Sequence, residues 1–153
     1  MNALNPESRV LLIGIGNDGR GDDGLGWRFA DALAGAPGLD IEYRYQLQVE
    51  DAECIAKYPV VVFVDAARDP LPDGFALLPC VPASGAGFST HRLDPEAVAW
   101  LAGSVFGAET VCYTLAISGY QWELGGGLSA RASANLQRAL EAFHHSRLLT
   151  CHA

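Results

Sequence analysis

Apolar runs along the chain alternate with segments in which apolar residues recur every three or four positions. The runs predict strands at residues 9–15, 41–45, 60–65, 74–78 and 110–118. The segments with the longer period predict helices, because that spacing places the apolar side chains on one helical face. These helices are expected at residues 23–33, 51–57, 94–106 and from residue 129 onward. Strands that alternate with helices favour an α/β fold with a mostly parallel sheet.

The composition of each run indicates where its strand lies in the sheet. Residues 9–15 and 60–65 are apolar without alternation, which is typical of strands covered on both faces. Residues 41–45 alternate and predict a less buried strand, whereas residues 74–78 lie between proline-containing turns, which favours a sheet edge. We therefore expect residues 1–153 to form a single domain, a doubly wound layer stack of five strands with helices on both faces.

Two of the predicted helices begin with recognisable capping residues. Asp94 is expected to cap one helix, because Pro95 fits the first turn and Glu96 complements the helix dipole. Ser129 is the expected cap of the last helix. The apolar stripe of that last helix consists of Leu128, Ala132, Leu136, Leu140 and Phe143.

Composition and charge exclude several classes of partner and site. The chain carries 10 Lys and Arg against 18 Asp and Glu, a formal net charge of −8. Nucleic acids and anionic membranes attract basic surfaces, so neither is expected as a partner. The apolar run at residues 10–15 is too short to span a bilayer or form a signal core, and the expected location is the cytoplasm. The dispersed cysteines at 54, 80, 112 and 151 are expected to be reduced packing residues.

The most distinctive segment joins the first predicted strand to its helix. Residues 10–26 read VLLIGIGNDGRGDDGLG, an apolar run followed by a glycine-rich turn that contains Asp18, Asp22 and Asp23. Such a turn usually binds an anion such as phosphate, because the free amides and the dipole of the helix point towards it. Three carboxylates would repel a phosphate. This turn therefore favours a cation.

The fold class indicates where this turn meets other polar residues. In doubly wound sheets, ligands bind outside the carboxyl ends of the strands, where the strand order reverses. The acidic turn follows the first strand, Asp65 ends the strand at 60–65, and His91 shortly precedes the helix at 94–106. Two carboxylates and one imidazole suit zinc, manganese, iron or nickel rather than calcium. Three protein ligands also leave a coordination position open for water or substrate.

Each of these residues also has a purely structural interpretation. Asp22 is well placed to cap the following helix, which leaves Asp23 as the stronger candidate for function. Asp65 can accept hydrogen bonds from the turn that follows it, and His91 can be a solvated or capping residue. From the residues alone, both interpretations stay open for Asp65 and His91.

Four segments occur in an order and spacing that extend over nearly the whole chain. They are GIGNDGRGDDGLG at 14–26, VDA at 64–66, STH at 89–91 and GYQWELGGGLS at 119–129. Together they resemble the nickel–iron hydrogenase maturation endopeptidases. The resemblance implies removal of a short C-terminal extension from the hydrogenase large subunit after nickel has been inserted. It also implies a twisted five-stranded sheet with helices on both sides.

The resemblance further implies which residues contact the metal. In that family these are an acidic residue after the first strand, an aspartate ending the third strand and a histidine after the fourth. By motif they fall on Asp23, Asp65 and His91, the triplet already selected by position and ligand type. Asp23 stands where many members have Glu, so its side chain is one methylene shorter. The implied partner is the nickel-loaded large-subunit precursor, with nickel supplied by the substrate and zinc or cadmium replacing it in vitro. The small size of the chain and its transient macromolecular substrate favour a monomer.

The candidate catalytic residues are Asp23, Asp65, His91 and Asp22. Peptide cleavage is expected either through water activated by the metal or through a carboxylate, Asp22 or Asp65, that acts as general base. The Gly-rich segment 79–91 is expected to be a mobile loop that folds over the peptide. Tyr120 and Trp122 either offer a flat surface to that peptide or pack against the last helix.

Two other functions are compatible with parts of the sequence. Gly14, Gly16 and Gly19 match the GxGxxG pattern of a dinucleotide-binding module, although the neighbouring carboxylates would repel a pyrophosphate. A non-enzymatic nickel-binding chaperone could use the same three metal ligands as the protease. Titration with NAD and with metal separates the first alternative from the others, and a cleavage assay separates protease from chaperone.

Overall fold

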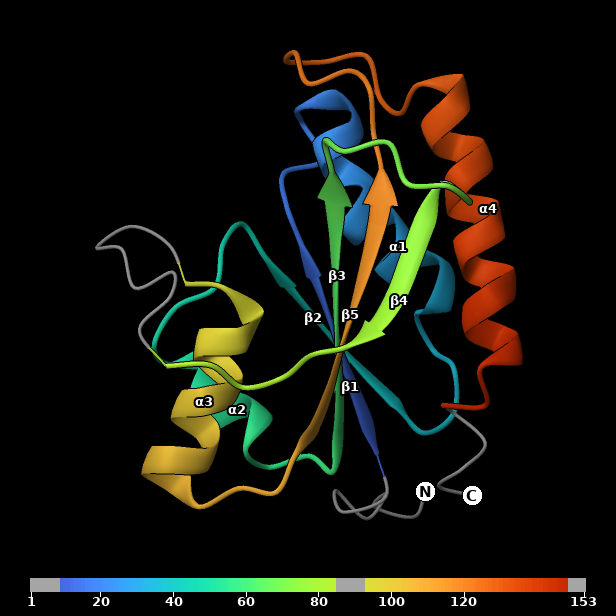
Figure 1. Ribbon diagram of the computed structural model, residues 1–153. Helices are drawn as coiled ribbons and strands as arrows, with labels where there is room; N and C mark the ends of the chain where they lie inside the picture. Colours follow the sequence, from blue (N-terminus) through green and yellow to red (C-terminus); the bar gives the residue numbers. More distant parts are fainter. Residues whose placement is uncertain (1–8, 85–92, 149–153) are drawn as a thin grey trace.

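The computed structural model of the chain, shown in Figure 1, describes residues 9–84 and 93–148. Its five-stranded sheet consists of β1 (Val10–Ile15), β2 (Leu39–Arg44), β3 (Val60–Ala67), β4 (Phe75–Pro79) and β5 (Val111–Ser118). The helices are η2, a 3-10 turn (Gly21–Gly24), α1 (Leu25–Leu33), α2 (Asp51–Ile55), α3 (Pro95–Phe106) and α4 (Ala130–His145). Within the described residues, none of them combines the length and apolar character needed to cross a membrane.

The sheet is doubly wound and mostly parallel, which confirms the predicted fold class. Its strand order is β2-β1-β3-β5-β4, and only the pairing of β4 with β5 is antiparallel among the described strands. Helices α1 and α4 cover one face of the sheet, and α2 and α3 cover the other (Figure 1). Strand β4 lies at one edge, as expected. Strand β2 lies at the other edge, which explains its partial exposure.

Successive residues of the inner strands point into two separate cores. Leu12 of β1 belongs to the core beneath α1 and α4, where the rings of Phe29 and Phe143 meet edge to face, 5.5 Å apart. The neighbouring Leu11 belongs to the core beneath α2 and α3, together with Ile55. A strand covered on both faces needs an apolar residue at every position, and this accounts for the unbroken apolar runs in the sequence.

The helix starts differ in part from the sequence-based expectations. Helix α1 begins at Leu25 rather than at residue 23, because the 3-10 turn η2 occupies the preceding residues. Asp94 stands at the N-cap of α3, but among the described residues its side chain receives no capping bond, and its carbonyl accepts from Ala97 instead. Ser129 caps α4 as expected: its hydroxyl oxygen accepts from the N–H of Ala132 at 3.2 Å.

The cysteines within the described residues are packing residues, as expected. Cys54, Cys80 and Cys112 are free thiols, and Cys151 lies outside the described residues. Burial raises the pKa of Cys80 to about 12 and that of Cys112 to about 11. Both thiols therefore stay protonated at neutral pH, and protonated thiols are poor nucleophiles and poor metal ligands.

Helix α1 approaches the sheet closely because two glycines lie at the contact. A Cβ atom added to Gly14 of β1 would lie 2.6 Å from the carbonyl oxygen of Gly26 in α1. A Cβ atom added to Gly26 would lie 2.5 Å from the carbonyl oxygens of both Ile15 and Val64. Any side chain at these positions would push α1, and the acidic turn before it, away from β1 and β3.

Gly26→Ala is therefore expected to lower the free energy of unfolding by about 2–3 kcal/mol, because backbone carbonyls at the contact cannot move aside. Gly103→Ala is a matched control in helix α3, where a Cβ atom meets only the carbonyl oxygen of Ala108, at 3.7 Å. The control should gain up to about 1 kcal/mol, because alanine favours the helix. Urea unfolding measures both changes, and equal effects in the two variants would contradict the close contact.

Candidate functional site

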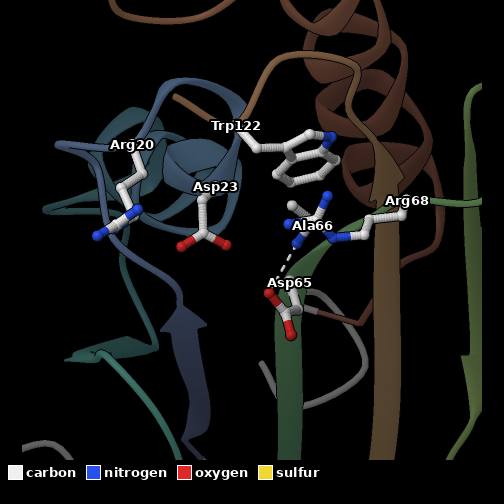
Figure 2. Close-up of a pocket in the computed structure, with 6 residues that line it drawn as sticks. All are labelled: Arg20, Asp23, Asp65, Ala66, Arg68 and Trp122. Carbon is white, nitrogen blue, oxygen red and sulfur yellow. Dashed lines mark hydrogen bonds between the residues drawn. The ribbon is translucent and has the colours of Figure 1, made fainter. Parts of the chain in front are cut away.

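The candidate site lies where the strand order reverses, between β1 and β3. A cavity of about 410 Å³ opens there at the carboxyl ends of the strands, lined by Arg20, Asp23, Asp65, Ala66, Arg68 and Trp122. Figure 2 shows Asp23 on the turn after β1 and Asp65 on β3, facing the same space. The structure thus brings together two of the predicted metal ligands, although they are far apart in the sequence.

The turn itself holds the Asp23 carboxylate in place. The backbone N–H of Asn17 donates to both the carbonyl oxygen and Oδ2 of Asp23, each at 3.1 Å. The side-chain oxygen of Asn17 accepts from the N–H of Gly19 at 2.9 Å, which closes a second small ring. Gly16 adopts a φ of +136° and lies so close to the carbonyl oxygen of Asp23 that no side chain would fit. The glycines therefore serve the tight turn that presents Asp23.

Asp65 lies between two cavities. Its Oδ1 accepts a hydrogen bond from the N–H of Ala66 at 2.8 Å, as the structural interpretation of this residue predicts, and it also lines the cavity that Asp23 lines. On its other side, Asp65 borders a smaller cavity of about 140 Å³ together with Leu47 and Leu93. The structural and functional interpretations of Asp65 are therefore compatible, because the hydrogen bond orients the carboxylate at the cavity.

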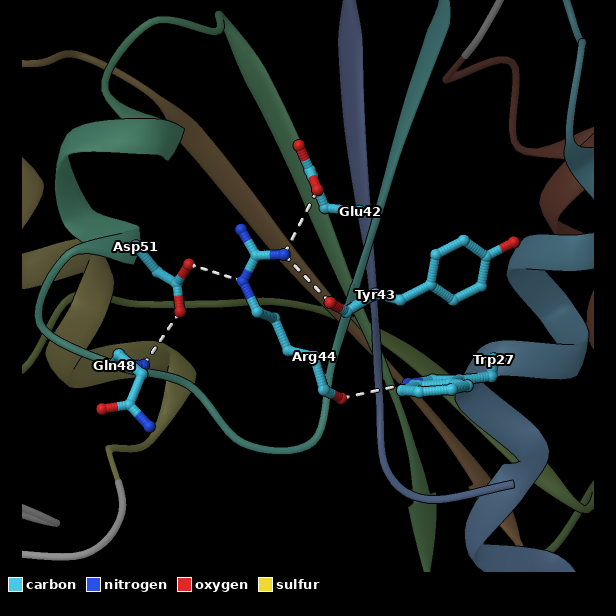
Figure 3. Close-up of polar contacts among 6 residues, drawn as sticks. All are labelled: Trp27, Glu42, Tyr43, Arg44, Gln48 and Asp51. Carbon is cyan, nitrogen blue, oxygen red and sulfur yellow. Dashed lines mark hydrogen bonds and ion pairs between the residues drawn. The ribbon is translucent and has the colours of Figure 1, made fainter. Parts of the chain in front are cut away.

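A partly buried ion pair holds the turn that forms the far wall of the smaller cavity. Asp51 accepts from Nε of Arg44 at 2.9 Å and from the N–H of Gln48 at 2.8 Å (Figure 3). The carbonyl oxygen of Arg44 in turn accepts from the indole N–H of Trp27 at 3.0 Å. These bonds link β2, α1 and α2, and they position the intervening Leu47 against the site.

Arg68 is a further residue of the site that was not among the predicted ones. Its guanidinium carbon lies 4.2 Å from the ring centroid of Trp122, so the indole face holds the cation over the cavity (Figure 2). Arg20 lines the same cavity. The signal in the sequence was the place of Arg68, three residues after Asp65 and just beyond a strand end. Two guanidinium groups beside two carboxylates give the cavity both hydrogen-bond donors and anionic ligands.

Asp22 has a different role from its neighbour, and its expected role as cap of the following helix is wrong. The N-cap of α1 is Gly24, whereas the Asp22 side chain turns away into the protein and is 0% exposed. Its carboxylate accepts from the N–H groups of Tyr120 at 2.7 Å, Gln121 at 3.0 Å and Ser129 at 2.7 Å, and from the Ser129 hydroxyl at 2.7 Å. Asp22 thus joins the acidic turn to the loop before α4.

This environment also determines the charge of Asp22. Burial alone would raise the pKa of the Asp22 carboxyl, but the hydrogen bonds from Ser129, Tyr120 and Gln121 outweigh it and hold the pKa below its ordinary value. Asp22 is not among the residues that line the cavity. It is a positioning residue, and the structure offers no support for its role as general base.

The loop before α4 is bonded to the acidic turn at several further points. The N–H of Asp22 donates to the carbonyl oxygen of Gln121 at 2.7 Å, and the N–H of Gly125 donates to that of Gly19 at 2.8 Å. Tyr120 packs on α4, where its ring contacts Arg131, whereas Trp122 faces the cavity. Of the two predicted roles, packing against the last helix therefore applies to Tyr120, and a surface at the site applies to Trp122.

The hydrogen bonds made by the backbone of the glycine-rich turn weigh against a dinucleotide site. A pyrophosphate needs free backbone N–H groups in the glycine-rich turn. In this turn the N–H groups of Asn17 and Asp23 donate to backbone oxygens within the turn, that of Gly19 donates to a side chain, and that of Asp22 donates to the distant loop. The GxGxxG match therefore reflects close packing rather than phosphate binding.

The third predicted ligand, His91, lies outside the described residues, as do residues 85–91 of the predicted lid at 79–91. Within residues 9–84 and 93–148, no group of three His, Cys, Asp or Glu side chains is arranged to hold a metal ion. The donor set that is described consists of the carboxylates of Asp23 and Asp65, which suit a divalent transition metal when a third ligand is added. The described residues therefore fit part of a metal site.

The comparisons with known proteins identify the fold. The chain matches no protein-family model and no curated protein. Among solved structures, it is similar to the NiFe hydrogenase maturation protease HycI from Thermococcus kodakarensis KOD1, with 24% identity, 91% and 92% of the two chains covered and a TM-score of 0.69. It is also similar to the hydrogenase maturating endopeptidase HybD from E. coli, with 21% identity, 91% of each chain covered and a TM-score of 0.73.

A hydrogenase 2 maturation peptidase from a Thaumarchaeota archaeon has the same architecture, with 20% identity, 92% of this chain and 99% of that chain covered and a TM-score of 0.65. The similarity in each case extends over nearly the whole chain. At identities this low the likeness establishes the fold, and it confirms the fold that the sequence motifs implied. The present chain thus has the fold of the hydrogenase maturation proteases.

Proposed function

We propose that this chain is an endopeptidase that removes the C-terminal extension from the nickel-loaded precursor of a NiFe hydrogenase large subunit. The observation that carries the proposal is the placement of Asp23, on the turn after β1, and Asp65, near the end of β3, which line one cavity where the strand order reverses. The fold supports it, because the similar solved structures are hydrogenase maturation proteases. The acidic cavity suits a substrate that carries a cation.

In this proposal the nickel ion belongs to the substrate. Asp23, Asp65 and His91 contact the nickel held by the precursor, so the protease recognises a large subunit that has received its metal. Leu93 supports the assignment of His91, because it lines the small cavity beside Asp65 and is only two residues away along the chain. Zinc or cadmium would occupy the same ligands in vitro, since both accept carboxylate and imidazole donors.

The proposed chemistry is hydrolysis of one peptide bond. Water adds to the scissile carbonyl carbon, the carbon–nitrogen bond breaks, and the leaving amine takes up a proton. In this proposal the Asp65 oxygen that does not contact the nickel accepts the proton of the water. The hydrogen bond from the N–H of Ala66, which orients the carboxylate at the cavity, supports this role. Arg68, held over Trp122, supplies donors for the carbonyl oxygen as negative charge develops there.

The proposal is tested with the large-subunit precursor from the same organism, prepared with and without nickel. After incubation with this protein, mass spectrometry is expected to show loss of a C-terminal peptide from the nickel-loaded precursor only. Loss from both forms would contradict recognition through nickel. Loss from neither form, together with nickel binding by this protein, would instead favour the non-enzymatic chaperone.

A further inference from the structure

A second cavity lies beside the candidate site, between α4 and the segment that connects β3 to β4. It has a volume of about 280 Å³, and its lining includes Leu71, Gly74, Tyr120, Arg131, Asn135 and Arg138. We call this cavity the arginine groove. Neither the proposed cleavage chemistry nor the proposed metal ligands make use of it.

The wall of the groove opposite α4 is held by buried hydrogen bonds. The hydroxyl of Ser118, which is fully buried, donates to the carbonyl oxygen of Asp69 at 2.8 Å and accepts from the N–H of Leu71 at 3.0 Å. The N–H of Ser118 donates to the carbonyl oxygen of Gly74 at 2.9 Å. The connecting segment is therefore fixed to the end of β5, and the groove is preformed.

The floor of the groove is a buried amide. Asn135 is 4% exposed, and its side-chain nitrogen donates to the carbonyl oxygen of Ser118 at 3.1 Å and to the hydroxyl oxygen of Tyr120 at 2.9 Å. Gly74, with a φ of +82°, lies against the side-chain oxygen of Asn135 so closely that no side chain would fit. Because the Tyr120 hydroxyl accepts the bond from Asn135, its own proton remains available to a ligand.

Two arginines supply positive charge at the groove. The guanidinium of Arg131 lies over the ring of Tyr120, 4.1 Å from the ring centroid, and Arg138 contacts the side-chain oxygen of Asn135 at 3.4 Å. Within the described part of the chain, the ion pairs involve Arg9 and Arg44, and neither groove arginine has a carboxylate partner. In a chain with a net charge of −8, two such arginines at one cavity indicate an anionic ligand. A planar guanidinium matches a carboxylate particularly well.

The groove and the candidate site are built on the same two segments. Arg68 lines the site and Leu71 lines the groove; likewise Trp122 lines the site and Tyr120 lines the groove. The N–H of Gly119 donates to the carbonyl oxygen of Ala67 at 2.9 Å and joins the two segments. A peptide that extends from the site across the end of β5 would therefore reach the groove.

We propose that the arginine groove binds a carboxylate of the peptide extension that the protease releases. Arg131 and Arg138 would pair with this carboxylate, with the Tyr120 hydroxyl as a further donor. The groove would thus hold the extension while Asp23 and Asp65 contact the metal in the body of the large subunit. This inference rests on the proposed endopeptidase function. It adds a binding site for the peptide extension, the part of the substrate that the metal site does not contact.

The first test measures processing by the double variant R131Q/R138Q. Loss of both charge-assisted contacts is expected to raise KM for the nickel-loaded precursor about 10-fold and to leave kcat within about 2-fold of wild type. The control R28Q/K57Q removes the same charge from exposed residues that line neither cavity, and its KM should stay at the wild-type value. An unchanged KM in R131Q/R138Q, with active wild-type protein, would overturn the inference.

A second test identifies the carboxylate. One precursor carries amides in place of the acidic side chains of its extension, and another carries an amidated C-terminus. One of these substrates is expected to show the same rise in KM with wild-type protein, and no further rise with R131Q/R138Q. If neither modification changes KM, the groove does not bind a carboxylate of the extension.

A third measurement does not depend on proteolysis. Acetate is titrated into the protein while the arginine side-chain N–H signals are followed by NMR. Saturable shifts are expected for Arg131 and Arg138 and not for Arg28, and their absence would overturn the carboxylate site. If wild-type protein fails to process the precursor but these shifts occur, the proposed function and the assignment of the extension as ligand are both wrong, whereas the carboxylate site stands.

Discussion

Asp22→Ala is expected to lower the free energy of unfolding by about 3–5 kcal/mol, one of the two largest effects predicted for this chain. The substitution removes the buried carboxylate that accepts three backbone N–H groups and one hydroxyl. Asp22→Asn keeps the shape but replaces one acceptor oxygen with an N–H₂ donor that faces other donors. Its effect should therefore approach that of alanine. Urea unfolding followed by circular dichroism measures both variants.

The stability that Asp22 contributes also depends on pH in a defined direction. Its pKa is held below the ordinary value of 3.8 in the folded protein, so the folded state favours the carboxylate. The contribution is therefore fully present above the ordinary pKa and is lost as the pH falls through the lower, folded-state pKa. The difference in stability between wild type and Asp22→Ala should be constant near neutral pH and narrow below pH 3.8.

The matched control for Asp22 is Asp18→Ala. Asp18 belongs to the same acidic turn, but it is exposed. Its removal should change the free energy of unfolding by less than about 0.5 kcal/mol. A similar loss of stability in Asp18→Ala and Asp22→Ala would contradict the proposed role of Asp22. So would a stability difference between wild type and Asp22→Ala that stays the same at acidic pH.

Asp23→Asn and Asp65→Asn are each expected to reduce processing of the nickel-loaded precursor at least about 100-fold, with little loss of stability. Each substitution removes an anionic oxygen from the cavity while keeping the size of the side chain. The amide oxygen of asparagine can still accept the N–H of Asn17 or of Ala66, so the local backbone should be preserved. Asp22 differs in this respect, because both of its oxygens act as acceptors.

Processing rates and unfolding curves together separate the two kinds of aspartate. Asp23→Asn and Asp65→Asn should unfold within about 1 kcal/mol of wild type while losing activity. Asp18→Asn, which removes a charge from the same turn but not from the cavity, should process the precursor at the wild-type rate. The assignment of the site would be contradicted by a rate within about 3-fold of wild type in either cavity variant.

Several features of this protein follow directly from the pattern of residues. The strands β1 and β3 were predictable because residues 10–15 and 60–64 are buried and therefore form unbroken apolar runs. The predicted position of Asp65 at a strand end placed it near the carboxyl edge of a parallel sheet, where the cavity is found, although β3 continues two residues further, to Ala67. Ser129 was recognisable as a helix cap because a capping bond connects residues only three positions apart.

Other features depend on contacts between distant segments. Asp22 and Asp23 are adjacent and chemically identical, yet Asp22 is buried and bonded to the loop before α4, whereas Asp23 faces the cavity. The groups that bind Asp22 lie 98 to 107 positions further along the chain, so no local pattern could distinguish the two residues. The same holds for Arg68, whose guanidinium lies over the ring of Trp122, 54 positions further along the chain.

The sequence by itself determined the order of strands and helices along the chain and the burial of the inner strands on both faces, because these follow from the local spacing of apolar residues. It also indicated the carboxyl ends of the strands as the place of the candidate site. Tertiary structure alone decided which aspartates share the cavity, which one is buried as a brace, and that two arginines gather at a neighbouring groove. The physical reason is that hydrogen bonds and charge pairs act through space over a few ångströms, whereas sequence patterns report only on residues that are close along the chain.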